Sequence, residues 1–188
     1  MDIETVKLRR SVGKTATVDL VTMALFASLG LATKNVVRPI VGVIVGALYV
    51  PTGAVTGGLY MMWPVMAYGF VGKLGAATIT SLIQAFISLV SPAGNFGILS
   101  FVIYLAPGLA IDGFFLLTQH RACCVACCMG AAAIANTVGT VLVGALVLSL
   151  PEITLLFLAL IAAISGCLGG FIANMVLVKI RKIGLGGK

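Results

Sequence analysis

Hydrophobic residues along the chain form long continuous blocks, not the alternating pattern of a strand or the one-sided pattern of a helix that faces water. Four stretches without charged residues span 39–72, 74–111, 122–151 and 153–178. A helix needs about 20 predominantly apolar residues to cross a bilayer, so each stretch is long enough for at least one crossing. A further span at residues 15–33 carries Asp19 near its start.

The number of spans follows from turn signals inside these stretches. Residues 74–111 hold two spans, because Ser-Pro-Ala-Gly-Asn at 91–95 is a turn signal. Residues 122–151 and 153–178 hold one span each, and 39–72 holds one full span after a shorter piece at 39–50. A piece of about 12 residues is short for a crossing and typical of a re-entrant or interfacial segment.

Positive charge decides whether the 39–50 piece crosses the bilayer. If it does not, the basic N-terminus, Lys73, Arg121 and the basic C-terminus all lie on the cytoplasmic side, as the positive-inside rule requires. We therefore predict an all-α integral membrane protein with six transmembrane helices and a short re-entrant or interfacial segment after the first. Seven helices stay possible.

The same topology defines the parts of the chain. We expect one multi-pass membrane domain in the cell membrane over residues 1–188, with its transmembrane bundle at 15–180. The basic segment 1–14 and the tail 181–188 are expected to be cytoplasmic. Lys34 and Arg38 then lie on the external side, against the rule, and need a separate reason.

Composition supports a membrane protein and excludes other classes. Of the residues, 61% are hydrophobic and 9% are charged, whereas a soluble domain carries about 25% charged residues. A water-soluble fold and a disordered chain are both excluded. The net charge of +7 comes from basic residues that flank the apolar blocks, where they set topology near lipid headgroups. We therefore expect the lipid bilayer, and no nucleic acid, as a partner.

Motifs for catalysis are weak. Residues 11–15, Ser-Val-Gly-Lys-Thr, resemble the end of a phosphate-binding P-loop, but Leu8 occupies the position of its required first glycine. The single histidine and the scattered acids form no catalytic constellation, so we predict a protein that is not an enzyme and has no ATPase of its own. Asp112 is the one acid inside a late span; a functional role and an interhelical hydrogen bond both remain open.

A cysteine-rich segment offers a second possible chemistry. His120, Cys124 and Cys128 follow i, i+4, i+8 spacing, with Cys123 and Cys127 beside them. Imidazole and thiolate groups on one helical stripe could hold a soft metal ion, whereas buried cysteines also pack as small apolar residues. We predict no metal and no cofactor. A metal or haem protein built on His120 and the Cys123–Cys128 cluster stays an alternative.

The segment 57–64 is the most distinctive part of the chain. Tyr60 and the only tryptophan, Trp63, are three residues apart and share a helix face, and Pro64 frees a backbone carbonyl nearby. Two aromatic rings beside a loosened backbone suit a flat ring ligand. Neutral hydrogen-bonding groups of neighbouring spans and three external polar residues would complete an outward-facing pocket. The predicted substrate-binding residues are Tyr60, Trp63, Gln84, Asn95, Tyr104, Asn136, Lys34, Asn35 and Arg38.

Small residues at four-residue spacing mark one face of the first span. Ala24, Ser28 and Ala32 lie on one stripe, where the backbone of another helix can approach closely. Such a stripe serves either packing within the bundle or docking of a partner helix.

Four stretches carry a resemblance to a known family. They are Gly-Leu-Tyr-Met-Met-Trp-Pro at 58–64, the segments 75–85 and 107–113, and Ser-Gly-Cys-Leu-Gly-Gly at 165–170. They resemble the substrate-binding S components of energy-coupling factor (ECF) transporters, most closely the thiamine/hydroxymethylpyrimidine type.

This resemblance implies a function and a set of partners. The chain would be the substrate-capture subunit of an ECF-type ABC importer for a small vitamin or vitamin precursor. Ala24, Ser28 and Ala32 would dock onto a transmembrane coupling subunit, which two cytoplasmic ATPase subunits drive with ATP. A stand-alone small-molecule channel or secondary carrier is the second alternative.

Overall fold

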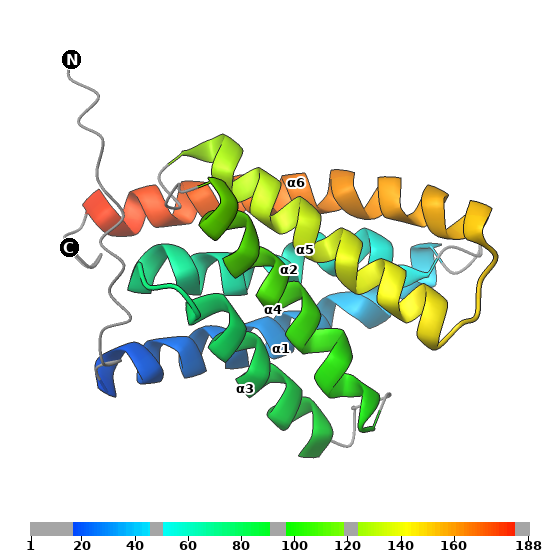
Figure 1. Ribbon diagram of the computed structural model, residues 1–188, viewed down its shortest axis with the longest axis horizontal. Helices are drawn as coiled ribbons and strands as arrows, with labels where there is room; N and C mark the ends of the chain where they lie inside the picture. Colours follow the sequence, from blue (N-terminus) through cyan, green and yellow to red (C-terminus); the bar gives the residue numbers. More distant parts are fainter. Residues whose placement is uncertain (1–16, 46–50, 91–96, 119–123, 183–188) are drawn as a thin grey trace.

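The computed structural model describes residues 17–45, 51–90, 97–118 and 124–182, which form helices and short turns (Figure 1). The six helices are α1 Thr17–Val45, α2 Thr52–Val71, α3 Ala76–Val90, α4 Leu99–Thr118, α5 Val125–Leu146 and α6 Glu152–Lys182. Four of them, α1, α4, α5 and α6, are long and apolar enough to cross a membrane. The prediction of an all-α membrane protein with six helices is confirmed.

The first helix is longer than the sequence pattern predicted. Residues 39–45 continue α1 through Pro39 and do not form a separate re-entrant segment; residues 46–50 lie outside the described part of the chain. A proline removes one backbone hydrogen bond but need not end a helix in a membrane protein. At 29 residues, and with a rise of about 1.5 Å per residue, α1 is longer than a bilayer core about 30 Å thick.

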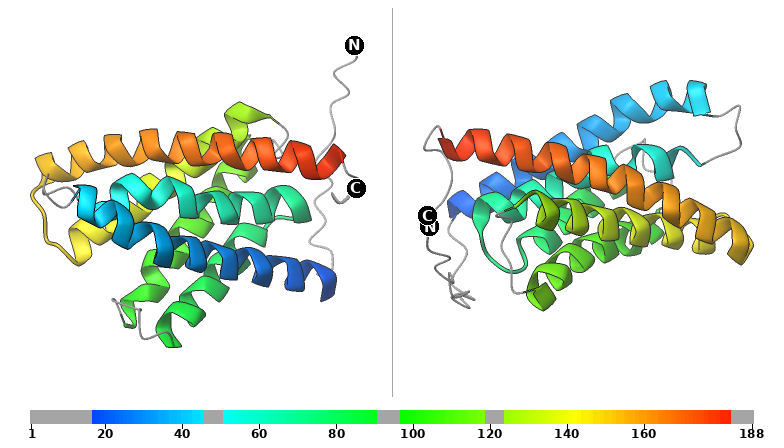
Figure 2. Two further views of the ribbon diagram at one scale, coloured as in Figure 1. Left: turned by 180° about the vertical axis from the view of Figure 1, so that it is seen from behind. Right: turned by 90° about the horizontal axis from the view of Figure 1, so that it is seen from above.

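Helix α2 lies at the centre of the bundle. It packs against α1, α3, α5 and α6, while α5 and α6 form the most extensive helix pair (Figures 1 and 2). Large apolar side chains on the outside are exposed, among them Leu156, Leu160 and Ile164 of α6. The apolar surface turned outward is what a bilayer solvates, and the interior is correspondingly rich in small residues.

Glycine contacts hold α2 and α5 against α6. A Cβ atom at Gly169 would overlap the backbone of Gly58, and one at Gly58 would overlap the backbone of Ser165. On the α5 side, a Cβ at Gly166 would lie 2.6 Å from the carbonyl oxygen of Ala132. Real Cβ atoms do not come this close, so the backbones can meet only because these positions lack side chains.

Charged side chains link three helices at one end of the bundle. The start of α1 and the end of α6 lie at this end (Figures 1 and 2). Asp19 of α1 forms an ion pair of 2.7 Å with Lys73, which follows α2. Arg181, near the end of α6, donates a hydrogen bond of 3.1 Å to the carbonyl of Gly69. Glu152, at the start of α6, lies at the opposite end.

We predict that Gly169→Leu destabilises the protein, because the added side chain must force α6 away from the backbone of Gly58. Overpacking of this kind costs about 1–3 kcal/mol, which should lower the apparent melting temperature in detergent by several degrees. Gly113→Ala is the matched control, since a Cβ there meets nothing within 4 Å. Equal melting temperatures for the two variants would show that the close approach does not stabilise the bundle.

Candidate functional site

A cavity of about 480 Å³ opens between the helices at the end opposite the Asp19–Lys73 ion pair. Its wall is formed by residues of α1, α2, α4, α5 and α6, by Pro51, which precedes α2, and by residues of the connection between α5 and α6. Most of this wall is apolar, including Met61, Ile103 and Leu158. A cavity of this size, apolar with a few polar groups, has the character of a small-molecule site.

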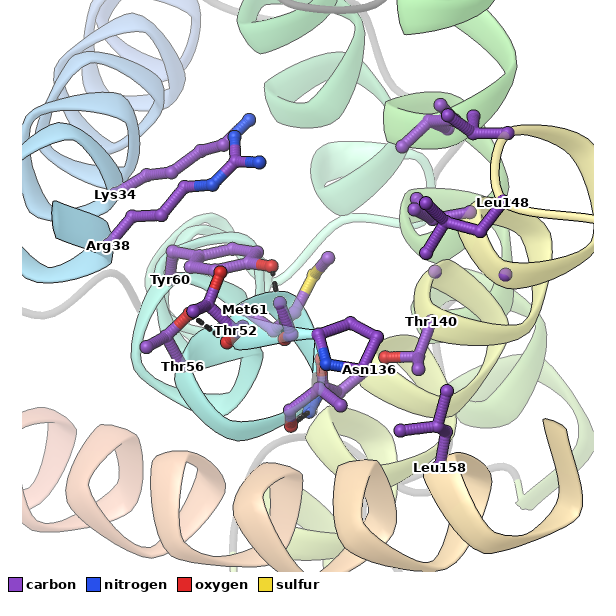
Figure 3. A pocket seen from close by; sticks show the side chains of 18 of the residues that line it. Lys34, Arg38, Thr52, Thr56, Tyr60, Met61, Asn136, Thr140, Leu148 and Leu158 are labelled. Atoms are coloured by element: carbon purple, nitrogen blue, oxygen red, sulfur yellow. Dashed lines mark hydrogen bonds between the residues drawn. The ribbon is translucent and has the colours of Figure 1, made fainter. Parts of the chain in front are cut away.

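Helix α1 supplies two positive charges to the cavity. Lys34 and Arg38 are four residues apart, so they lie on the same face of the helix, and both line the wall. Both are half-buried, and Figure 3 shows their side chains extending side by side toward the cavity. The described lining residues include these two cations and no aspartate or glutamate. The cavity is therefore electrostatically suited to a ligand that is neutral or negatively charged.

Lys34 also joins α1 to α4 across the cavity. Its ammonium group donates a hydrogen bond to the hydroxyl of Tyr104 and lies 4.7 Å from the centre of the Tyr104 ring. Helices α1 and α4 otherwise make little or no direct contact. The Lys34–Tyr104 pair thus closes a gap that helix packing leaves open.

Helix α2 contributes an aromatic wall. Tyr60 lines the cavity and its hydroxyl donates a hydrogen bond of 3.4 Å to the carbonyl of Gly53, one of the first residues of the helix. The hydroxyl of Thr56 bonds at 2.7 Å to the carbonyl of Thr52 on the same side (Figure 3). The hydroxyls of Tyr60 and Thr56 thus donate to carbonyl groups of their own helix. The face of the Tyr60 ring is then the main surface that α2 offers to a ligand.

Asn136 of α5 forms the deepest polar contact of the cavity. Its side-chain nitrogen donates to the carbonyl of Ala162 at 2.8 Å and to the carbonyl of Ala54 at 3.3 Å. It is nearly fully buried, and Gly57 leaves the space that its amide occupies. Asn136 therefore ties α2, α5 and α6 together where the cavity begins, and satisfies its own buried donors in doing so.

Five of the nine predicted substrate-binding residues meet at this cavity, three lie elsewhere, and one lies outside the described part of the chain. Lys34, Arg38, Tyr60, Tyr104 and Asn136 line it. Asn35 is on the exposed side of α1, Gln84 is buried and donates to the carbonyl of Ala27 at 3.5 Å, and Asn95 lies outside the described residues.

Trp63 also lies outside the cavity lining. Its indole nitrogen donates to the hydroxyl of Thr33 at 3.0 Å, and its ring packs against Phe26 with centroids 6.2 Å apart. Residues three apart on a helix differ by about 60° in direction. On α2 this difference separates Tyr60, which faces the cavity, from Trp63, which faces α1.

Sequence reasoning missed three threonines of the wall: Thr52, Thr56 and Thr140. Threonine is common in membrane helices, where its hydroxyl usually bonds to the carbonyl four residues earlier, so it carries no distinctive signal. Only the direction of the side chain, toward a cavity or toward a neighbouring helix, separates a lining threonine from the others.

Asp112 lies away from the cavity and joins two helices. It is buried on α4 and accepts hydrogen bonds from the backbone nitrogen of Thr78, at 2.8 Å, and from the Thr78 hydroxyl. Thr78 is in the first turn of α3, where unpaired backbone N–H groups attract a carboxylate. Of the two roles open for Asp112, these contacts favour the interhelical hydrogen bond.

The described part of the cysteine-rich segment begins at Cys124. His120 and Cys123 lie outside the described residues. Among the residues that the structure does describe, no group of three or more histidine, cysteine, aspartate or glutamate side chains could hold a metal ion.

Comparison with known proteins identifies the family. Residues 18–138, more than half of the chain, match the family described as the permease component of an ABC-type cobalt transport system. The chain therefore belongs to this family, and it is a membrane transport subunit, not an enzyme. No curated protein sequence matches it significantly.

The fold is also that of a solved transporter subunit. The crystal structure of an S-component of ECF transporter superposes on this chain with a TM-score of 0.69 at 22% sequence identity. The match covers 89% of this chain and 84% of that one. The six-helix arrangement predicted from the apolar stretches and the positive charges is thus confirmed as the fold.

We predict that Asp112→Ala lowers stability by about 1–3 kcal/mol, because it leaves the two donors of the partly buried Thr78 without their acceptor. Asp112→Asn, which keeps an acceptor oxygen, should lose less. Thermal unfolding in detergent checks both. If Thr78→Val and Asp112→Ala were fully additive in the double variant, the two residues would not act through the bond described here.

Proposed function

We propose that this chain is the substrate-capture subunit, or S component, of an ECF-type importer, and that the cavity binds a small ring-containing molecule. The single observation that carries this proposal is the cavity itself. Charged, aromatic and amide groups from separate helices converge on one apolar space at one end of a bundle with the S-component fold.

Charge distribution supports an orientation for the bundle. Lys73, Lys179, Arg181 and Lys182 all belong to the end opposite the cavity. By the positive-inside rule this end faces the cytoplasm, so the two chain termini are cytoplasmic and the cavity opens to the outside. Lys34 and Arg38 depart from the rule on the external side, and a role in binding substrate explains why they are placed there.

The groups in the cavity support a proposal for the substrate class. The rings of Tyr60 and Tyr104 offer flat surfaces for stacking, and the hydroxyls of the threonines and tyrosines offer hydrogen bonds. A vitamin or vitamin precursor with a heteroaromatic ring fits this set, and thiamine or hydroxymethylpyrimidine is one such pair. Of these two, the cations Lys34 and Arg38 favour the neutral pyrimidine over the positively charged thiamine.

Cobalt is the second candidate substrate, because the family's description names a cobalt transport system. A bare cobalt ion needs imidazole, thiolate, carboxylate or similar ligands. The lining residues in the described ranges include no histidine, cysteine, aspartate or glutamate, and two of them are cations. This donor set favours an organic ligand over the free metal ion.

The outer face of α1 is proposed to contact the coupling subunit. Ser28 and Ala32 are exposed and Ala24 is partly exposed, with the exposed Val21, Leu25 and Leu29 around them. The hydroxyl of Ser28 donates a hydrogen bond of 2.9 Å to the carbonyl of Ala24 on the same helix. Its donor is therefore satisfied, and the stripe presents only small side chains to a partner. A partner helix could pack closely here, and the partner ATPase subunits would supply the energy of ATP.

The binding proposal predicts that protein extracted gently from its host retains a small molecule, detectable by native mass spectrometry. Once that molecule is identified, Tyr60→Leu should weaken its binding about tenfold or more, since stacking on an aromatic ring contributes about 1–3 kcal/mol. Trp63→Phe is the matched control and should change affinity little, because Trp63 packs against α1.

Two results would contradict the binding proposal. One is a larger effect of Trp63→Phe than of Tyr60→Leu, which would move the ring site to the α1 side of α2. The other is stoichiometric Co²⁺ binding that survives Lys34→Met and Tyr60→Leu, with no organic ligand retained. That result would replace the proposed substrate by the metal ion.

The docking proposal predicts that Ser28→Leu prevents co-purification with the ATP-driven complex while leaving ligand retention unchanged. A bulky residue in the stripe would keep a partner helix at a distance. Val102→Phe, an enlargement on the exposed side of α4, is the control and should leave the complex intact. An intact complex with Ser28→Leu would place the contact on another face.

A further inference from the structure

Two cysteine thiols lie in contact at the start of α5. Cys124 caps the helix in an extended backbone conformation, and Cys127 is in the first turn. The Cys124 thiol donates a hydrogen bond to the Cys127 sulfur, and the two sulfur atoms are 2.8 Å apart. Cys124 is exposed and Cys127 is partly exposed, so both thiols are accessible in the described structure. The spacing Cys-Val-Ala-Cys is that of a dithiol that can close on itself.

The helix start is an environment that stabilises a thiolate at Cys124 once its thiol loses the proton. The backbone N–H of Cys127 donates to the sulfur of Cys124 at 3.4 Å, in the way that a capping side chain satisfies a free N–H group. The positive end of the helix dipole adds to this effect. Cysteines at helix N-termini and in Cys-X-X-Cys sequences are the ones whose thiolates react.

The neighbouring cysteines in the described chain have a different environment. Cys128 is fully buried and accepts a hydrogen bond of 3.7 Å from the amide of Asn174 on α6. A Cβ at Gly170 would lie 2.3 Å from the Cys128 carbonyl oxygen if that oxygen did not move, so the backbone here is tightly packed. Cys167 is on a different helix, α6.

We propose that Cys124 and Cys127 form a redox-active dithiol, a modification site separate from the substrate cavity. The oxidant is a small disulfide of the glutathione class. The Cys124 thiolate attacks one sulfur of that disulfide, the S–S bond breaks, and one thiolate leaves. The Cys127 thiolate then attacks the Cys124 sulfur of the mixed disulfide and expels the second thiolate. The protein loses two electrons and two protons, and the small disulfide becomes two thiols.

The order of attack follows from accessibility. Cys124 is the more exposed sulfur and the one that accepts the backbone N–H, so it meets the external disulfide first. Cys127 lies in contact with it, placed to resolve the mixed disulfide. The dithiol is at the bundle end where α6 finishes (Figure 1), which the proposed orientation turns toward the thiol-containing cytoplasm.

The test uses the full chain in detergent, treated with glutathione disulfide, quenched with acid and alkylated with N-ethylmaleimide before peptide mapping. We expect a Cys124–Cys127 disulfide that dithiothreitol reverses. Cys127→Ser should instead trap one glutathione on Cys124, and Cys124→Ser should abolish the disulfide. Serine is itself a good capping residue, so the Cys124→Ser variant keeps the helix start.

Cys167→Ser is the matched control and should leave the Cys124–Cys127 disulfide unchanged. Two results would overturn the proposal. One is alkylation of both Cys124 and Cys127 after treatment with glutathione disulfide. The other is a disulfide that joins Cys124 to Cys123 and not to Cys127. Ligand retention by the same samples is independent of the outcome, because the cavity lining includes no cysteine among the described residues.

Discussion

Close backbone contact between α2, α5 and α6 is the constraint on which the rest of the bundle depends. In lipid no hydrophobic force drives helices together, so packing and interhelical hydrogen bonds must hold them. Gly58, Gly166, Gly169 and Gly170 supply the packing, because none has a side chain to separate the backbones. The Asn136 amide and the Ser165 hydroxyl, which bond to carbonyls of α2, supply the hydrogen bonds.

The same contact produces the cavity. Helices α2, α5 and α6 meet most tightly along their middle, and α1 and α4 flank them without packing on each other. The space between these elements at one end stays open as the cavity, and Lys34 and Tyr104 bond to each other at its wall. The glycines that hold the helices together, such as Gly58 and Gly169, are not among the described lining residues.

Polar groups in the interior have two distinct positions. Asp112, Gln84, Trp63 and Ser165 each bond to a neighbouring helix away from the cavity and hold it in place. Lys34, Arg38 and Tyr60 line the cavity, and Lys34 bonds across it to Tyr104. A buried polar residue in a membrane helix must find a partner, and the partner decides whether it serves the fold or the substrate. The dithiol at Cys124 and Cys127 belongs to neither group, since it lies at the start of α5, at the opposite end from the cavity.

The class of protein and the number of helices were determined by the sequence alone, because apolar blocks of bilayer length leave the chain few alternatives. The continuation of α1 through residues 39–45 was not predictable, since a proline in an apolar run fits a break and an unbroken helix equally well. In the sequence, Tyr60 and Trp63 are equally good candidates for stacking on a ring ligand. Their directions differ by about 60° around α2, so Tyr60 faces the cavity and Trp63 packs against Phe26. Only the packing of neighbouring helices, which local sequence does not encode, decides which polar side chains meet.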